Sequence, residues 1–190
     1  MKKIALDLDG VVFDTENLYR VFTEMYDVDH FHGDNVIDNT QRLFTHRYSW
    51  NENDFTSFYD NYSPYVLENG PVMTGCKGVL EKLIKYFEIV VITSRRDNEL
   101  DYAKEFFQSL NINLDIYNNC LKIEKCLELG IDFIIDDDPI TCLEASQNNI
   151  KALYFKNNAS ECLEENEYLK NVHNWGEIYK YFMLGGNYEN

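Results

Sequence analysis

Short apolar runs alternate with longer amphipathic stretches along most of the chain. Five runs have the length and composition of buried strands, and they lie at residues 4–8, 89–93, 114–117 (the weakest), 132–135 and 152–155. Between them, apolar positions recur with helical spacing, most clearly at residues 75–87 and 98–110. Strands that alternate with helices form parallel βαβ units with right-handed crossovers. The pattern therefore predicts an α/β fold, with a Rossmann-like parallel sheet in a three-layer arrangement.

Residues 15–71 break this alternation, because they contain no convincing buried strand and yet hold twelve aromatic residues. Helices are expected in three places, around residues 15–26, 36–46 and 53–62. We interpret the segment as a small helical cap, inserted after the first strand and joined by short connections near Asp14 and Pro71. Most of its rings should form the cap's own core. The expected division is an α/β core of residues 1–14 and 72–190 with a cap subdomain of residues 15–71.

Acidic and hydroxyl side chains follow three of the predicted strands. Asp7 and Asp9 end the first strand, and Thr93 and Ser94 end the second. Residues 136–138 are three consecutive aspartates at the end of a later strand. Because parallel strands bring their carboxyl ends to one edge of the sheet, we expect these side chains to converge there. Such convergence is how catalytic sites are built on this architecture.

The two acids that end the first strand need a neutralising partner. Side chains two apart on a strand point to the same side, so Asp7 and Asp9 would repel each other unless a cation, a shared proton or a turn at Gly10 intervened. A divalent cation also removes the repulsion among all the converging carboxylates. Hard oxygen ligands suit Mg²⁺, which a substrate phosphate commonly completes. Thr93 and Ser94 could then bond the remaining phosphate oxygens.

A lysine should complete this phosphate site as a point charge. Lys122 and Lys125 are both suitably placed before the strand that ends in residues 136–138. Each of these groups also has an ordinary alternative. The Asp-x-Asp-Gly sequence can be a simple turn, the Thr93-Ser94 pair can cap the helix that follows, and either lysine can be a solvated helix residue.

Other residues near these motifs carry less information. The Asp138-Pro139 pair is typical of a helix start, with proline at the first helical position. Arg95 and Arg96 fit surface charges as well as they fit phosphate contacts. The four histidines have no metal-ligand spacing, and the five cysteines form no C-x-x-C pair, so we expect reduced core thiols.

The overall composition limits the class of partner. The chain has 190 residues, of which 45% are hydrophobic, so it can bury a substantial core. Its formal net charge of -16 argues against a nucleic-acid polymer or an anionic membrane as a partner, but not against a small phosphate ester held by a cation. No targeting segment or membrane-crossing run is evident. We expect a cytoplasmic protein, and the sequence predicts no oligomeric state.

Together, these motifs resemble the haloacid dehalogenase (HAD) superfamily of aspartate-dependent phosphotransferases. The first family motif, D-x-D-x-[TV] after an apolar strand, matches "DLDGV" at residues 7–11. The second, an apolar strand that ends in Thr or Ser, matches "VVITS" with Thr93, and the fourth, a strand that ends in paired acids, matches "FIIDDD". The third motif is a single lysine. The motifs and the intervening cap cover nearly the whole chain, so the resemblance implies a HAD-like core with a cap.

Within that superfamily the chain is more similar to the 5'(3')-deoxyribonucleotidases and their bacterial relatives. The likeness rests on the helical cap directly after the first motif, the Thr-Ser pair, and the segments "PVMTGCKGVLEKL", "LKIEKCLELGIDFIIDDDP" and "VHNWGEIYKYF". It implies a 5'-nucleotidase acting on (deoxy)nucleoside monophosphates. The alternative substrate is another small phosphate ester, such as a sugar phosphate.

The resemblance also implies roles for individual residues. Asp7 would be the nucleophile that forms an aspartyl phosphate. Asp9 would protonate the leaving alkoxide and then activate water, while its backbone carbonyl helps to hold Mg²⁺. The remaining metal ligand would be Asp137, supported by Asp136. Thr93, Ser94 and a lysine would bind the phosphate.

Two non-enzymatic classes of protein are alternatives to this phosphatase. A receiver-type signalling module likewise combines Mg²⁺, acids, a threonine and a lysine on a parallel sheet. In that class the paired acids follow the first strand and the phosphorylated aspartate comes later, whereas this chain has the reverse order and an inserted cap. An inert scaffold is disfavoured because no catalytic position is missing.

Overall fold

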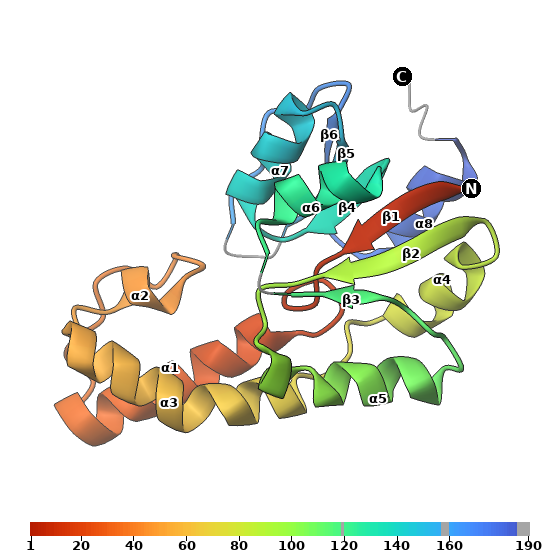
Figure 1. Ribbon diagram of the computed structural model, residues 1–190. Helices are drawn as coiled ribbons and strands as arrows, with labels where there is room; N and C mark the ends of the chain where they lie inside the picture. The colour runs from red at the N-terminus through yellow and green to blue at the C-terminus, as the bar shows by residue number, and fades with distance from the viewer. Residues whose placement is uncertain (119, 157–159, 186–190) are drawn as a thin grey trace.

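The computed structural model describes residues 1–118, 120–156 and 160–185, and at its centre is a parallel β-sheet (Figure 1). The strands are β1 (Lys2–Leu6), β2 (Phe87–Ile92), β3 (Ile116–Tyr117), β4 (Phe133–Asp136), β5 (Lys151–Phe155) and β6 (Leu169–Val172). They lie in the order β3-β2-β1-β4-β5-β6, and every neighbouring pair is parallel. Strand β1 thus lies between β2 and β4, with Ile4 paired to both Ile89 and Phe133.

Helices cover both faces of the sheet. They are α4 (Cys76–Leu83), α5 (Asp101–Ser109), α6 (Lys122–Leu129), α7 (Pro139–Gln147) and α8 (Trp175–Met183). Helices α4, α5 and α8 pack on the face that carries Leu6 and Val91, whereas α6 and α7 pack on the face that carries Ala5 and Val90. Successive strand residues point to opposite faces, so strands covered on both sides are apolar at nearly every position. The predicted three-layer α/β fold is confirmed.

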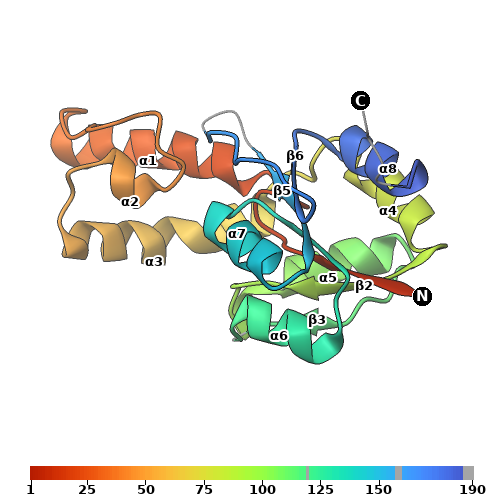
Figure 2. The same ribbon diagram turned by 90° about the horizontal axis from the view of Figure 1, so that it is seen from above.

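The segment between β1 and α4 extends beyond the carboxyl end of the sheet as three helices (Figures 1 and 2). They are α1 (Thr15–Phe31), α2 (Phe44–Arg47) and α3 (Glu52–Asn69). Their aromatic side chains pack around four buried rings, those of Tyr26, Tyr48, Trp50 and Phe58. This cluster is distinct from the two apolar clusters on the sheet, so most of the rings do form a core for the segment itself.

The two connections between this segment and the sheet lie side by side. The Asp14 amide donates to the Pro71 carbonyl at 2.8 Å, and Phe13 forms a β-bridge with Val72. The chain therefore leaves and re-enters the sheet layer at almost the same point. We keep residues 15–71 as the proposed cap.

One cap helix is not where the periodicity predicted it. Of residues 36–46, only the last three belong to a helix, α2 (Phe44–Arg47). The Asp38 carboxylate accepts hydrogen bonds from the Thr40 amide (2.9 Å), the Thr40 hydroxyl and the Gln41 side chain. These local bonds stabilise a turn in place of a helix.

Two further differences concern the sheet. The helix predicted over residues 75–87 ends at Leu83, and Phe87 instead begins β2, where it pairs with Lys2 of β1. An apolar residue at position 87 fits both the helical period and the strand period. Its pairing with Lys2 of β1 makes it part of the strand. Strand β6 was not predicted, because its sequence "LKNV" is half polar, and it lies at the edge of the sheet beside β5.

The five cysteines are free thiols that differ in burial. Cys76, Cys126 and Cys142 are buried free thiols and Cys120 is half-buried. Cys162 is exposed, so the expectation of a core thiol is wrong there, because this residue lies in irregular chain between β5 and β6.

In the parts of the chain that the structure describes, no helix combines the length and the apolar character needed to cross a membrane.

Candidate active site

A cavity of about 690 Å³ lies where the carboxyl ends of β1 and β2 and the residues after β4 face the proposed cap. Its walls include side chains from every motif of the sequence, namely Asp7, Asp9, Thr93, Ser94, Lys122 and Asp137. The proposed cap contributes Tyr19, Arg42 and Phe44. The parallel sheet thus brings together residues that are far apart in the sequence, as the strand-end pattern predicted.

The chain turns sharply after Asp7. The Asp7 amide still donates to the neighbouring strand β4 (3.0 Å), but the Leu8 carbonyl accepts from the Phe13 amide (2.9 Å) and closes a loop. Gly10 in this loop has φ +76°, a conformation that favours glycine. The turn directs Asp7 and Asp9 to different partners. It therefore reduces the repulsion between them, although the charge of Asp9 still contributes to the raised pKa of Asp7.

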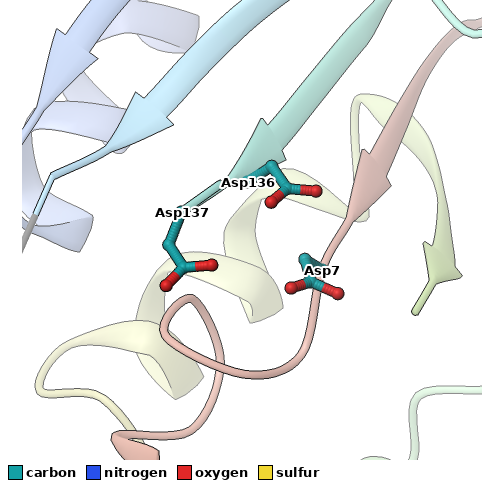
Figure 3. Close-up of side chains that lie close together, drawn as sticks. All are labelled: Asp7, Asp136 and Asp137. Atoms are coloured by element: carbon teal, nitrogen blue, oxygen red, sulfur yellow. The ribbon is translucent and has the colours of Figure 1, made fainter. Parts of the chain in front are cut away.

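Asp7 lies in a group of three buried carboxylates with Asp136 and Asp137 (Figure 3). One carboxylate oxygen from each residue lies within 4.8 Å of the others. Two cations flank the group. The Lys122 ammonium lies 3.1 Å from Asp7 Oδ1 and 2.7 Å from Asp136 Oδ2, and Arg42 Nη1 lies 3.0 Å from Asp137 Oδ2. Among the described residues, three carboxylates thus share two cationic partners.

The burial of these charges shifts their titration. Burial raises the pKa of Asp7 to about 7, although the neighbouring Lys122 opposes that rise. Burial likewise raises the pKa of Asp137 well above its usual value, against the effect of Arg42. For Lys122, burial lowers the pKa, but Asp7 and Asp136 outweigh it and hold the pKa above the usual value. A further cation would therefore stabilise the ionised carboxylates of this group.

The donor set fits Mg²⁺, a hard cation that prefers carboxylate oxygens and a phosphate. Both oxygens of Asp136 are already engaged, by Lys122 and by the Asp138 amide (2.9 Å). Asp7 and Asp137 are therefore the better ligands, with Asp136 in support. Within the described residues, the Asp9 carboxylate lies outside this group. The part of Asp9 that could bind the metal is therefore its backbone carbonyl, as the resemblance implies.

Gly10 makes the position of Asp137 possible. A Cβ atom at Gly10 would overlap the Asp137 carboxylate, so a side chain at this position would displace that carboxylate. The glycine of the D-x-D-G sequence therefore serves two purposes. It provides the turn that separates Asp7 from Asp9, and it leaves room for the acid that follows β4.

Of the residues expected to bind phosphate, Thr93, Ser94 and Lys122 line the cavity and Lys125 does not. Thr93 is buried and Ser94 is exposed, and both line the cavity; neither caps a helix, because the helical turn that follows (Asp97–Glu99) begins after Arg96. Lys122 lies in the cavity, whereas Lys125 pairs with an exposed glutamate three residues further on. The geometry therefore favours Lys122. As expected, Asp138 caps α7.

No sequence pattern singled out Arg42, and Arg95 fitted a surface charge as well as a phosphate contact. The surface-charge interpretation of Arg95 is wrong: its guanidinium is buried and forms two hydrogen bonds to the Asp9 carboxylate. Arg96, its neighbour, is exposed and lies over the ring of Tyr59. An isolated arginine in a loop has no periodicity that could have revealed such contacts.

This six-stranded parallel sheet, with carboxylates after β1 and β4 and an inserted helical segment, has the fold of the HAD-like hydrolases. Neither a family model nor a curated protein matches the sequence. Among solved structures, a haloacid dehalogenase-like hydrolase from Streptococcus pneumoniae is similar over 96% of this chain and 98% of its own, with a TM-score of 0.69 and 16% identity.

Two other structures extend this comparison. A HAD family hydrolase from Deinococcus radiodurans, which holds phosphate and sodium, has a TM-score of 0.71 at 11% identity over 98% of this chain and 96% of its own. The CbbY protein from Rhodobacter sphaeroides, in complex with xylulose-(1,5)bisphosphate, has a TM-score of 0.58 at 11% identity over 94% of this chain and 96% of its own. At such identities the likeness establishes the fold.

Proposed function

We propose that this protein is a Mg²⁺-dependent phosphomonoester hydrolase that acts through an aspartyl phosphate on Asp7. One observation carries the proposal. Asp7, at the end of the central strand, shares a buried group with Asp136, Asp137 and Lys122 at the wall of a cavity of about 690 Å³. That arrangement presents a carboxylate nucleophile beside groups that neutralise an incoming phosphate.

The reaction has two displacements at phosphorus. In the first, an Asp7 carboxylate oxygen attacks phosphorus, the ester P–O bond breaks, and Asp9 gives a proton to the leaving alkoxide. In the second, Asp9 takes a proton from water as the water oxygen attacks phosphorus, and the bond between phosphorus and Asp7 breaks to release inorganic phosphate. Lys122, Thr93 and Ser94 hold the phosphate oxygens during both steps.

Mg²⁺ would be held by Asp7 and Asp137, with Asp136 and the Asp9 backbone carbonyl in support. When bound, it supplies the positive charge that lets an anionic ester approach a carboxylate nucleophile. Asp136 has the further task of holding the Lys122 ammonium in place, at 2.7 Å.

For the ester we propose a nucleoside monophosphate. Of the twelve aromatic residues in residues 15–71, Tyr19 and Phe44 line the cavity, and their rings stack on each other at 5.5 Å. An aromatic pair in the wall offers a surface on which a base can stack. The alternative is a sugar phosphate, and it is supported by the similar fold of the Rhodobacter protein that binds xylulose bisphosphate.

The proposal is tested by phosphate release from 4-nitrophenyl phosphate, with Mg²⁺, with Ca²⁺ and with a chelator. We expect activity with Mg²⁺, little with Ca²⁺, whose larger and looser shell misplaces the nucleophile, and none with the chelator. Asp7→Asn should fold and be inactive, because an amide cannot form the acyl phosphate. Appreciable turnover by Asp7→Asn would reject the mechanism.

The substrate class is tested by a panel of esters. We expect kcat/KM for deoxynucleoside monophosphates to exceed that for small sugar phosphates by roughly tenfold to a hundredfold, which corresponds to about 1 to 3 kcal/mol of stacking. A ratio near one or below would leave a phosphatase with the sugar phosphates as its candidate substrates.

A further inference from the structure

The Asp9 carboxylate is held from one side by a buried arginine. Arg95 Nη2 donates to Asp9 Oδ1 at 2.7 Å, and Arg95 Nε donates to Asp9 Oδ2 at 2.9 Å. These two bonds join residues that are 86 positions apart in the sequence. A bidentate pair of this kind fixes the plane of the carboxylate as well as its position, because the guanidinium is a rigid planar fork.

Arg95 is itself firmly held. Its side chain is 1% exposed, and its Nη1 donates to the carbonyls of Leu67 (3.1 Å) and Glu99 (3.3 Å). The guanidinium also lies over the ring of Phe13, 5.2 Å from its centre. These contacts engage four of the five N–H donors of the guanidinium, and within the described residues Arg95 is not part of the cavity wall.

The Leu67 contact has a second consequence. Leu67 belongs to the last turn of α3, directly before the connection that returns from the proposed cap to the core. Arg95 therefore bridges the Asp9 carboxylate and the end of α3. The orientation of Asp9 is tied to that helix end through a single side chain.

We propose that Arg95 is a positioning residue, which orients the Asp9 carboxylate for proton transfer and ties that orientation to the end of α3. The assignment rests on the proposed function, since it is Asp9 that moves the proton. Asp9 is half-buried, with 32% of its side chain accessible. In the described structure, the hydrogen bonds to the Asp9 carboxylate come from Arg95. Without Arg95, none of these bonds would hold the carboxylate in one orientation. A misplacement of about 1 Å costs on the order of a hundredfold in rate.

The test compares two esters in Arg95→Lys and Arg95→Gln. An alkyl phosphate releases an alkoxide that needs the proton from Asp9, whereas 4-nitrophenyl phosphate releases a stable anion. We expect kcat/KM to fall by roughly a hundredfold for the alkyl ester but by less than about fivefold for the aryl ester. This split is the decisive readout, because general loss of structure lowers both values equally.

Two further variants sharpen the test. In an Asp9→Asn background, Arg95→Lys should cause no further loss with the alkyl ester, because Arg95 acts through Asp9. Arg96→Gln changes the neighbouring exposed arginine and should leave both esters unaffected.

Each remaining outcome counts against the assignment. Equal losses for both esters, or Arg95 variants that no longer fold, would show that Arg95 serves stability alone. A wild-type protein that releases no phosphate from either ester would overturn the proposed function, and this assignment with it. An active wild type with equal losses would overturn the assignment alone.

Discussion

Arg42 of the proposed cap forms an ion pair with Asp137, the acid that follows β4, with Nη1 3.0 Å from Oδ2. Its second nitrogen, Nη2, lies 3.3 Å from Asp138. A cationic side chain from residues 15–71 thus contacts the carboxylate that we propose as a ligand of Mg²⁺. The contact links the cap to the acidic group directly.

Removal of Arg42 should make Mg²⁺ bind more readily, because the arginine and the metal would compete for the Asp137 carboxylate. For Arg42→Gln we expect half-maximal thermal stabilisation at a roughly fivefold lower Mg²⁺ concentration, which corresponds to a coupling of about 1 kcal/mol. The measurement is the midpoint of thermal unfolding against MgCl₂ concentration. Arg20→Gln is the control, since Arg20 pairs with Glu16 and does not contact the acidic group. An unchanged Mg²⁺ dependence in Arg42→Gln would argue against competition.

Lys122→Met should destabilise the metal-free protein, because it leaves two buried carboxylates without their cation. We expect a loss of about 3 to 5 kcal/mol in the free energy of unfolding at pH 8. The loss should be smaller at pH 5. In the folded protein the pKa of Asp7 is raised to about 7 even with Lys122 present. The free energy of unfolding therefore falls as pH rises from about 4 through 7. At pH 5 Asp7 is largely protonated, so the loss of Lys122 leaves less unpaired negative charge.

The measurement for Lys122 is urea unfolding at pH 5 and pH 8 in the presence of a chelator. Lys125→Met is the matched control, since Lys125 stands on the same helix and pairs with Glu128 outside the cavity. It should change stability little at either pH. A larger effect of Lys125→Met than of Lys122→Met would show that Lys122 is not the cation on which the buried carboxylates depend.

Asp137→Asn and Asp138→Ala should have different consequences. Asp137→Asn should raise the Mg²⁺ concentration needed for phosphatase activity, because it weakens a proposed ligand. Asp138 accepts from the Thr141 amide (2.9 Å) and caps α7, so Asp138→Ala should reduce stability by about 1 kcal/mol and leave the Mg²⁺ requirement nearly unchanged. Activity against Mg²⁺ and urea unfolding measure the two effects. A larger change in Mg²⁺ requirement for Asp138→Ala would place the ligand one residue further along the chain.

Phe44→Leu tests whether a base stacks in the cavity. The change keeps an apolar side chain but removes the ring, so kcat/KM for a nucleoside monophosphate should fall by about tenfold, with little change for a sugar phosphate. Phe55→Leu is the control, because Phe55 packs against Phe44 at 6.1 Å but does not line the cavity. Equal losses for both classes of ester would remove Phe44 from substrate recognition.

Much of the fold follows from local pattern. Strands buried on both faces are apolar at nearly every position, so β1, β2, β4 and β5 are visible as short runs between helical periods. Parallel connections then place the carboxyl ends of these strands at one edge. For that reason the convergence of Asp7, Thr93 and Asp137 on one cavity could be predicted without a structure.

Other features depended on contacts that local pattern does not encode. The choice between Lys122 and Lys125 was open because both stand near the start of one helix, and only the packing of α6 on the sheet directs Lys122 to Asp7. The half-polar segment Leu169–Val172 forms strand β6 because its backbone pairs with the edge of β5. Arg42 and Arg95 meet their aspartates across 95 and 86 positions of sequence. The sequence alone determined most of the strands and the acids that follow them, because the hydrophobic period of a strand is local. Tertiary packing decided which cations neutralise those acids, because that depends on how residues 15–71 and the loops fold back over the sheet.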